Sequence, residues 1–289
     1  MSNAGKINNG GIGRIGRGFT LVELLVVISI IGLLSTIAIV STSTARDKAR
    51  IAGAQSFEAQ LTRAIGSSLA AEYDFEEGSG TSTADASGNG NGGALVNTPT
   101  WSTDTPFPAS KYSLSFSGTN WVQTAKGFGV ADSNFTVSAW VKTSSVTGQM
   151  YFVNNTGDGN GFRFGLSGGY MQFLIGNGAN TESGCGGSQK VSDGKWHQMA
   201  ISFSRTGLSV ACYLDGRNVG NVVLASNYPG MRDGSTNIGL TACCTAFIGL
   251  IDSVKIFAQD ASGVSFNPAG VAEKLRETAY ADERRSVLY

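Results

Sequence analysis

Glu23 is the residue whose type and place in the sequence most clearly suggest chemistry. It is the single charged residue in a run from Phe19 to Val40 that is otherwise uncharged and mainly apolar. An ionised carboxylate inside an apolar, membrane-length helix costs about 2.5 to 3.5 kcal/mol at the centre and less near an end, so such a residue is expected to serve a function. Glu23 therefore needs a partner that offsets its charge.

The run around Glu23 is long enough to cross a membrane as a helix. About 22 residues at about 1.5 Å each span roughly 33 Å, against about 30 Å of hydrocarbon. A secretory signal peptide is the alternative, with Ser43-Thr44-Ala45 as its cleavage site, but its apolar part usually has only about 7 to 15 residues. A lipoprotein anchor is excluded because no cysteine precedes Cys185.

The start of this run carries a resemblance to a known family. A basic leader ends at Gly18 and is followed by Phe19-Thr20-Leu21-Val22-Glu23, which resembles the N-terminus of type IV pilins and pseudopilins. The resemblance implies that a prepilin peptidase cleaves after Gly18 and that the new amine of Phe19 is methylated. It also implies that Glu23 neutralises the N-terminal amine of a neighbouring subunit.

The same resemblance implies a location and partners. The expected segments are a leader over residues 1–18 and a transmembrane and amphipathic helix over residues 19–71. Such a chain crosses the bacterial cytoplasmic membrane once, with its N-terminus in the cytoplasm, and then joins a filament in the periplasm or at the cell surface. Its expected partners are the prepilin peptidase, this membrane and other pilin subunits in a helical filament.

The second half of the expected helix is amphipathic. Apolar residues recur at steps of three and four, which is the period of one helix face: Ala54, Phe57, Leu61, Ile65 and Leu69. Gly66-Ser67-Ser68 weakens the end of the helix, and we place its close near Ala71. The apolar stripe is expected to pack against the chain's own globular domain, against neighbouring subunits, or against both along different parts of its length.

The remainder of the chain reads as β-structure. Residues 76–108 are rich in Gly, Ser, Thr, Asn and Asp, and short strands separated by turns follow. Alternation places Phe135, Val137, Ala139 and Val141 on one face of a strand and Trp140 on the other, where burial is the favoured role. His197 shares a face with Met199, Ile201 and Phe203, which favours a core or edge position over a catalytic one.

Five fragments spread along this region carry a second resemblance. They resemble laminin-G-like domains of the concanavalin A type, which implies a mainly β fold with two antiparallel sheets in a jelly roll over residues 72–268. Members of this group bind sugars, proteins or nothing, and Trp101, Trp121 and Tyr170 could stack on sugar rings. The fragments are Asp85-Ala86-Ser87-Gly88-Asn89, Phe135-Thr136-Val137-Ser138-Ala139-Trp140-Val141, Gly194-Lys195-Trp196-His197, Tyr213-Leu214-Asp215-Gly216 and Gly249-Leu250-Ile251-Asp252.

Asp252 is expected to need a specific partner. Alternation places it on the same face as Leu250, Val254 and Ile256, and a carboxylate on a core face must be paired. Calcium, which takes six to eight oxygen ligands, is one possible partner, and the resemblance implies that Asp85 and Asn89 would supply further oxygens. A hydrogen-bonded turn without metal is the alternative. No other cofactor is expected to be required.

The four cysteines are expected to lie outside the cytoplasm, where disulfides persist. Three complete pairings are possible. A bridge between the adjacent Cys243 and Cys244 would require a strained eight-membered ring, so we favour a bridge from Cys185 to one of them and leave Cys212 unassigned.

Other functions are disfavoured by composition and motif. The 21 basic and 21 acidic residues balance without a clustered basic patch, so nucleic-acid binding is not expected. No pair of acids stands out for glycan hydrolysis, since Glu182 is alone in a Gly-rich loop and Glu72, Glu76 and Glu77 flank the start of the domain, so the chain is not expected to be an enzyme. Residues 269–289 are expected to form a short charged helix.

These expectations combine into a function. The chain is expected to be a pilin-like filament subunit, of the minor or tip kind because its globular domain is large, that displays a lectin-like domain for surface adhesion or ligand recognition. The alternative is a minor pseudopilin of a type II-like secretion system that recognises exported proteins. The contact partner is a glycan or a protein surface.

Overall fold

A computed structural model describes residues 20–155, 160–178, 181–185, 190–226, 228–229, 231–232, 234–239, 245–261 and 264, without the side chains of 36–43, 181–183 and 245. The expected leader with Gly18 and Phe19, the C-terminal helix over 269–289, and both Cys243 and Cys244 lie outside the described residues. The chain divides into two compact units between Asp47 and Lys48.

Helix α1 (Leu21–Ile65) confirms the long N-terminal helix. The expected end near Ala71 is wrong, because a 3₁₀ turn (Gly66–Ser68) follows and Leu69 already pairs with Phe257 as the start of a strand. Glycine is a weak helix former, so the chain leaves the helix at Gly66. Within the part of the chain that could be searched, no helix is both long enough and apolar enough to cross a membrane.

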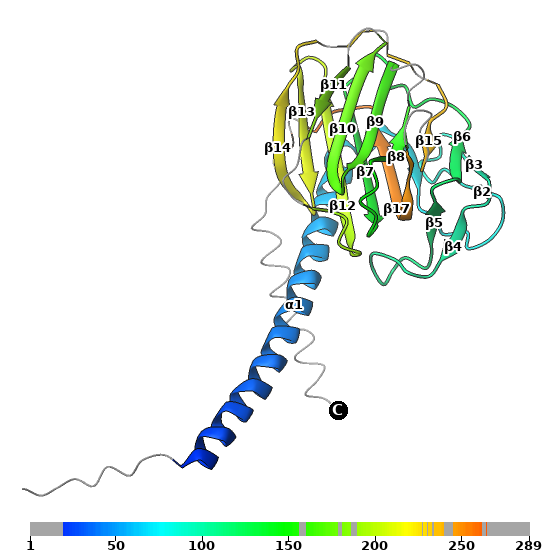
Figure 1. Cartoon of the computed structure of the whole chain (residues 1–289). Coiled ribbons are helices and arrows are strands. Elements are labelled where there is room, and N and C mark those ends of the chain that lie inside the picture. The colour runs from blue at the N-terminus through cyan, green and yellow to red at the C-terminus, as the bar shows by residue number, and fades with distance from the viewer. Residues whose placement is uncertain are drawn as a thin grey trace, which may run out of the picture. The chain divides into compact units, whose positions relative to one another are not determined.

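Two sheets confirm the mainly β architecture (Figure 1). Sheet A has eight strands, all paired antiparallel, and strand β17 lies near its middle. In spatial order these strands are β14 (Arg217–Val223), β13 (Ser209–Leu214), β12 (Trp196–Ser204), β7 (Phe135–Lys142), β17 (Ile248–Phe257), β5 (Ser113–Ser117) and β4 (Thr100–Ser102), with β1 (Leu69–Tyr73) also beside β17.

Sheet B has nine strands. Its pairs are antiparallel except for that between β16 and β8. In spatial order these strands are β11 (Thr181–Gly184), β10 (Tyr170–Asn177), β9 (Asn160–Ser167), β8 (Gln149–Asn154), β15 (Asn237–Ile238), β6 (Trp121–Thr124), β3 (Gly93–Val96) and β2 (Ser82–Thr83), with β16 (Thr245–Ala246) also beside β8.

The apolar core lies between the two sheets. Side chains from β7 and β12 meet those of β9 and β10, and aromatic rings make up much of the contact: Phe135 lies 4.8 Å from Phe162 and 5.0 Å from Phe203, measured between ring centroids. The expected inward face of β7 is confirmed, since Phe135, Val137, Ala139 and Val141 all belong to this core.

The outer face of sheet A is buried as well, because the second half of α1 packs on it. Phe57, Leu61 and Ile65 lie against Tyr213 and Phe257 in one cluster. Ala54 lies against Trp140 and Trp196 in another. The amphipathic stripe therefore packs on the chain's own globular domain, and it is the helix that covers Trp140.

One disulfide joins the two layers, between Cys185, directly after β11 of sheet B, and Cys212 on β13 of sheet A. The favoured bridge from Cys185 to Cys243 or Cys244 is therefore wrong. The two partners lie 5.8 Å apart between their Cα atoms, and only the packing of one sheet on the other brings them together.

We predict that replacing both Cys185 and Cys212 by alanine lowers the free energy of unfolding by about 3 kcal/mol, because the bridge closes a loop of moderate length in the unfolded chain. Urea unfolding with and without reductant measures this change. The unfolding midpoint of the double variant should be the same with and without reductant. Equal midpoints for the native chain in both conditions would contradict a bridge that stabilises the fold.

Candidate functional site

Thr20 and Glu23 form a reciprocal pair at the start of α1. The backbone N–H and the hydroxyl of Thr20 each donate to Glu23 Oε2, both at 2.8 Å, while the backbone N–H of Glu23 donates to Thr20 Oγ1 at 3.2 Å. This is a capping box. Glu23 thus already has a partner within its own chain, and the Thr-x-x-Glu spacing of the sequence was the signal for it.

The helix that follows Glu23 presents apolar side chains without a protein partner. The large apolar residues from Leu21 to Leu34 are between 47 and 80 % exposed in the single chain. A continuous apolar surface of this kind marks a site of contact with protein or membrane.

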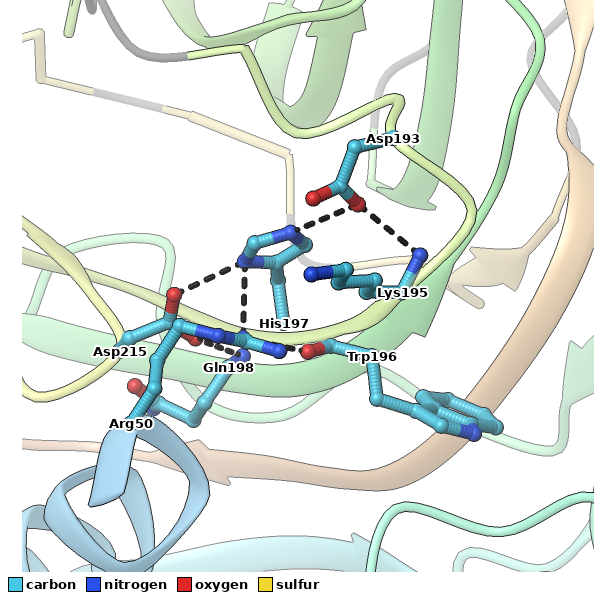
Figure 2. A network of polar contacts seen from close by, with 7 residues as sticks. All are labelled: Arg50, Asp193, Lys195, Trp196, His197, Gln198 and Asp215. Atoms are coloured by element: carbon cyan, nitrogen blue, oxygen red, sulfur yellow. Dashed lines mark hydrogen bonds and ion pairs between the residues drawn. The ribbon is translucent and has the colours of Figure 1, made fainter. Parts of the chain in front are cut away.

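A first polar anchor binds the second half of α1 to sheet A at the place where β12 begins and β13 ends (Figure 2). Arg50 Nη1 donates to the carbonyl oxygen of Trp196 at 2.6 Å and to Asp215 Oδ1 at 3.1 Å. Asp215 also accepts from the backbone N–H of Gln198 at 3.0 Å. A guanidinium with two oxygen acceptors fixes both the position and the rotation of the helix.

His197 belongs to this anchor and is buried, as the sequence predicts. Its Nδ1 lies 2.8 Å from Asp215 Oδ2 and its Nε2 lies 3.1 Å from Asp193 Oδ1. Asp193 also accepts from the backbone N–H of Lys195 at 2.9 Å. Both ring nitrogens are therefore used to hold carboxylates, which fits a structural role.

A second polar anchor is centred on Glu58, which is 7 % exposed on the inner face of the helix. Glu58 Oε2 accepts from Trp140 Nε1 at 2.8 Å, and Oε1 accepts from the Ser253 hydroxyl at 3.1 Å. Lys255 Nζ lies 2.8 Å from Glu58 Oε1 and 3.1 Å from Glu72 Oε1. Because these partners come from two strands, they fix the position of the helix on the sheet.

Asp85 and Asn89, two of the three predicted calcium ligands, lie in one turn. Asp85 Oδ1 accepts from the N–H groups of Glu72 and Ser87 and from the Ser87 hydroxyl, and Oδ2 accepts from Asn91 N–H. Partial burial acts to raise the pKa of Asp85, but these donors outweigh it and lower the pKa. Asn89 points its amide nitrogen at the carbonyl oxygen of Leu69, 2.8 Å away.

Asp252, the third predicted ligand, lies apart from this turn, on the outer face of sheet A, and is buried there. It pairs with Trp140 across the strands, and its Oδ2 accepts from the Ser110 hydroxyl at 3.0 Å. The expected shared face with Val254 and Ile256 is wrong, because β17 shifts register between Asp252 and Lys255 and both apolar residues point into the core. Among the described residues, no group of three or more His, Cys, Asp or Glu could hold a metal ion.

The aromatic residues considered for sugar contact differ in exposure. Trp101 is packed against the core. Trp121 is partly exposed and alternates with the buried Val122 on β6, while Tyr170 at the start of β10 is 43 % exposed. Two cavities also open on the unit from Lys48 onward. One of about 500 Å³ lies beside α1, and one of about 350 Å³ lies where β7 ends and β17 begins.

Two family models match the chain. The model of the concanavalin A-like lectin/glucanases superfamily matches residues 116–263, just over half of the chain. The model of the prokaryotic N-terminal methylation motif matches residues 14–39. No protein with a curated function matches the chain at a significant level.

Solved structures share the fold at low identity. Domain 4 of AbnA, an extracellular arabinanase from Geobacillus stearothermophilus solved in complex with arabinotriose, has a TM-score of 0.55 and 19 % identity over 71 % of this chain and 97 % of that domain. A structure of botulinum neurotoxin type C, whose cell entry depends on interaction with two ganglioside molecules, has a TM-score of 0.55 and 15 % identity over 70 % of this chain.

The binding domain of Paraclostridial Mosquitocidal Protein 1 gives a TM-score of 0.54 and 13 % identity over 71 % of this chain. The present chain spans about half the length of the two toxin structures, 50 % for the neurotoxin and 51 % for the mosquitocidal protein. At these identities the likeness shows the fold.

We predict that Glu58→Ala lowers the free energy of unfolding by about 3 to 5 kcal/mol, because it leaves Lys255 as a buried charge with one carboxylate fewer and removes the acceptor of Trp140. Thermal or urea unfolding measures the change. Gln55→Ala, an exposed position on the same helix, is the matched control and should change stability by less than about 0.5 kcal/mol. Equal effects of the two substitutions would contradict the anchor.

Proposed function

We propose that this chain, which belongs to the concanavalin A-like lectin/glucanases superfamily, is a pilin-like filament subunit whose β-sandwich contacts a ligand outside the cytoplasmic membrane. The observation that carries the proposal is the presence of an N-terminal methylation motif and a concanavalin A-like domain in one chain. The motif implies processing by a prepilin peptidase and pilin-type assembly.

In the proposed pathway, the apolar segment is held in the cytoplasmic membrane as a single pass with its N-terminus in the cytoplasm. Cleavage after Gly18 frees the amine of Phe19, which is then methylated. The exposed apolar side chains between Leu21 and Leu34 support a transfer from lipid into a bundle of identical helices, because they stay out of water in both environments.

Glu23 has a defined task in this pathway. In the single chain its carboxylate is held by Thr20. In the filament it meets the N-terminal amine of a neighbouring subunit, and the two opposite charges offset each other in an apolar surrounding. The capping box keeps the carboxylate at the helix start, where an incoming amine can reach it.

The sandwich supplies the contact surface. We place the ligand away from the outer face of sheet A, because α1 already covers that face. Tyr170 and Trp121 are the accessible aromatic side chains that could stack on a sugar ring. A calcium ion at Asp85 and Asn89 remains part of the proposal, as does the binding role over an enzymatic one. The Glu-x-Asp-x-x-Glu spacing of glycan hydrolases of this fold does occur once, at Glu72, Asp74 and Glu77. In this chain, however, Glu72 is held in an ion pair with Lys255, and Glu77 accepts hydrogen bonds from Thr83 and Ala84.

The first test changes Glu23 alone. We predict that Glu23→Gln leaves the chain in the membrane fraction but reduces its incorporation into sheared filaments at least about tenfold, because the amide cannot neutralise an amine. Ser29→Ala is the control, since Ser29 lies in the same segment and its hydroxyl donates to the carbonyl oxygen of Leu25 within the same helix. Native incorporation of Glu23→Gln would refute this mechanism.

The second test addresses the ligand. We predict that the unit from Lys48 onward binds one class of glycan on an array. Tyr170→Ala should weaken this binding about tenfold, or about 1.4 kcal/mol, because it removes an aromatic stacking surface. The fragment begins at Lys48 because the helix covers sheet A. Binding measured with calcium and with chelator tests the metal. No glycan binding in either condition would favour the secretion-system alternative, in which the sandwich recognises exported proteins.

A further inference from the structure

A strap crosses the outer surface of sheet A next to helix α1. Its residues 103–112 connect β4 to β5, and we refer to this segment as the strap. Phe107 in the strap lies edge-on against Trp140, with ring centroids 5.6 Å apart, and lines the 500 Å³ cavity together with Glu58 and Lys255. The position of the strap therefore decides how far Trp140 and this cavity are open.

The far end of the strap is held by carboxylates. The backbone N–H of Lys111 donates to both oxygens of Glu76, at 3.0 Å each. The Ser110 hydroxyl lies 2.7 Å from Glu76 Oε1, 3.0 Å from Asp252 Oδ2 and 3.1 Å from the carbonyl oxygen of Tyr112. A hydroxyl has one hydrogen to donate and here faces three acceptors.

Two ionised carboxylates cannot both be satisfied by that single hydrogen. If Asp252 carries a proton, it donates to Ser110 Oγ, and the Ser110 hydroxyl then donates to Glu76. Each hydrogen has one acceptor and the only net charge in the relay is on Glu76. If Asp252 is ionised, the Ser110 oxygen faces a carboxylate without a hydrogen between them, and Asp252 faces the charge of Glu76.

Asp252 is only 1 % exposed, so bulk water cannot solvate its charge. It sits where β17 changes its partner, because residues up to Ile251 pair with β5 and residues from Val254 onward pair with β1. Glu76 follows the end of β1, and Ser110 precedes the start of β5. The Ser110 hydroxyl lies between Glu76 and Asp252 at this point.

We propose that the strap is a proton-dependent latch, closed over Trp140 while Asp252 is protonated and hydrogen-bonded through Ser110 to Glu76, and released when Asp252 ionises. Release lets Phe107 leave Trp140 and opens the cavity beside α1. This device is independent of the filament role proposed above.

The charges around Asp252 set the direction of the switch. Burial raises the pKa of Asp252 to about 7, and Glu76 and Asp74 act in the same direction, against Ser110 and the Ser253 N–H. Burial and Glu72 likewise raise the pKa of Asp74 to about 6, although Lys255 opposes them. The charged groups on the elements around Asp252 are Asp74 and Glu76 after β1, Glu72 on β1, Lys255 on β17, Lys142 on β7, Glu58 on α1, and Asp104 and Lys111 in the strap.

The sign of the pH dependence follows from these directions. An acid whose pKa is raised in the fold contributes stability that is fully present below its unfolded pKa, about 3.9 for Asp, and is lost as the pH rises through the folded value. The latch is therefore closed at mildly acidic pH and open above about pH 7. Asp104 is not the switch, because partial burial is outweighed by Lys142 and Trp196, which lower its pKa.

Hydrogen exchange of the full-length protein tests the latch. We predict that the protection factor of the Lys111 amide, corrected for the intrinsic pH dependence of exchange, falls at least about tenfold from about pH 5.5 to about pH 8.5. Asp252→Asn should abolish this fall, because its amide can donate to Ser110 but cannot ionise. Glu77→Gln is the matched control, since Glu77 binds Thr83 and Ala84 instead, and it should keep the fall.

Either of two results would overturn the proposal. One is equal protection of Lys111 at both pH values in the native chain. The other is a full pH-dependent fall in Asp252→Asn. If Asp252→Asn does not fold, Ser110→Ala replaces it: without the relaying hydroxyl we expect low protection at both pH values, and a persisting tenfold fall would equally overturn the latch.

Discussion

The outer face of sheet A must be covered, and most of the structure follows from this constraint. Trp140, Tyr213 and Phe257 point away from the core between the sheets and are buried largely under helix α1, with Phe107 of the strap also lying against Trp140. Burying a large aromatic side chain contributes about 1.5 to 3 kcal/mol. The helix is therefore a third layer of the sandwich from Lys48 onward, and a domain that began after it would expose these side chains.

The two polar anchors fix the position of helix α1 on sheet A, which apolar contacts alone would leave less specific. Arg50 binds the first residue of β12 through the carbonyl oxygen of Trp196, and Glu58 binds β7 and β17 through Trp140 and Lys255. Removing one partner of such a buried pair leaves the other unsatisfied, so a shifted helix would cost more than a few apolar contacts. The same helix thus carries exposed apolar residues in its first half and packs on the sandwich with its second half.

Local patterns predicted much of this architecture. The helical period placed Phe57, Leu61 and Ile65 on one stripe, and the period of two placed Phe135 and Val137 in the core, because each element has one dominant buried face. The disulfide partner of Cys185 was missed, since it depends on how one sheet packs on the other. The face of Asp252 was also missed, because a register shift in β17 breaks the alternation on which the prediction relied.

Only part of the candidate functional site could be predicted from the sequence, because some of its contacts join residues that are far apart along the chain. Glu23 could be singled out because it lies in a motif of adjacent residues. Glu58 and Arg50 are ordinary charged residues of a helix until the fold brings Lys255 and Asp215 to them from far along the chain. Glu58 does carry one local sign, since it lies beside Phe57 and three residues before Leu61, within the buried stripe.

The claim that this chain is a processed filament subunit is tested most directly by the N-terminal peptide and intact mass of the protein recovered from its native membrane. The account predicts a chain that begins at N-methylated Phe19 and retains the apolar helix. A chain that begins after Ala45 would be a freely secreted sandwich and would contradict the account, as would an unprocessed chain that still begins at Met1.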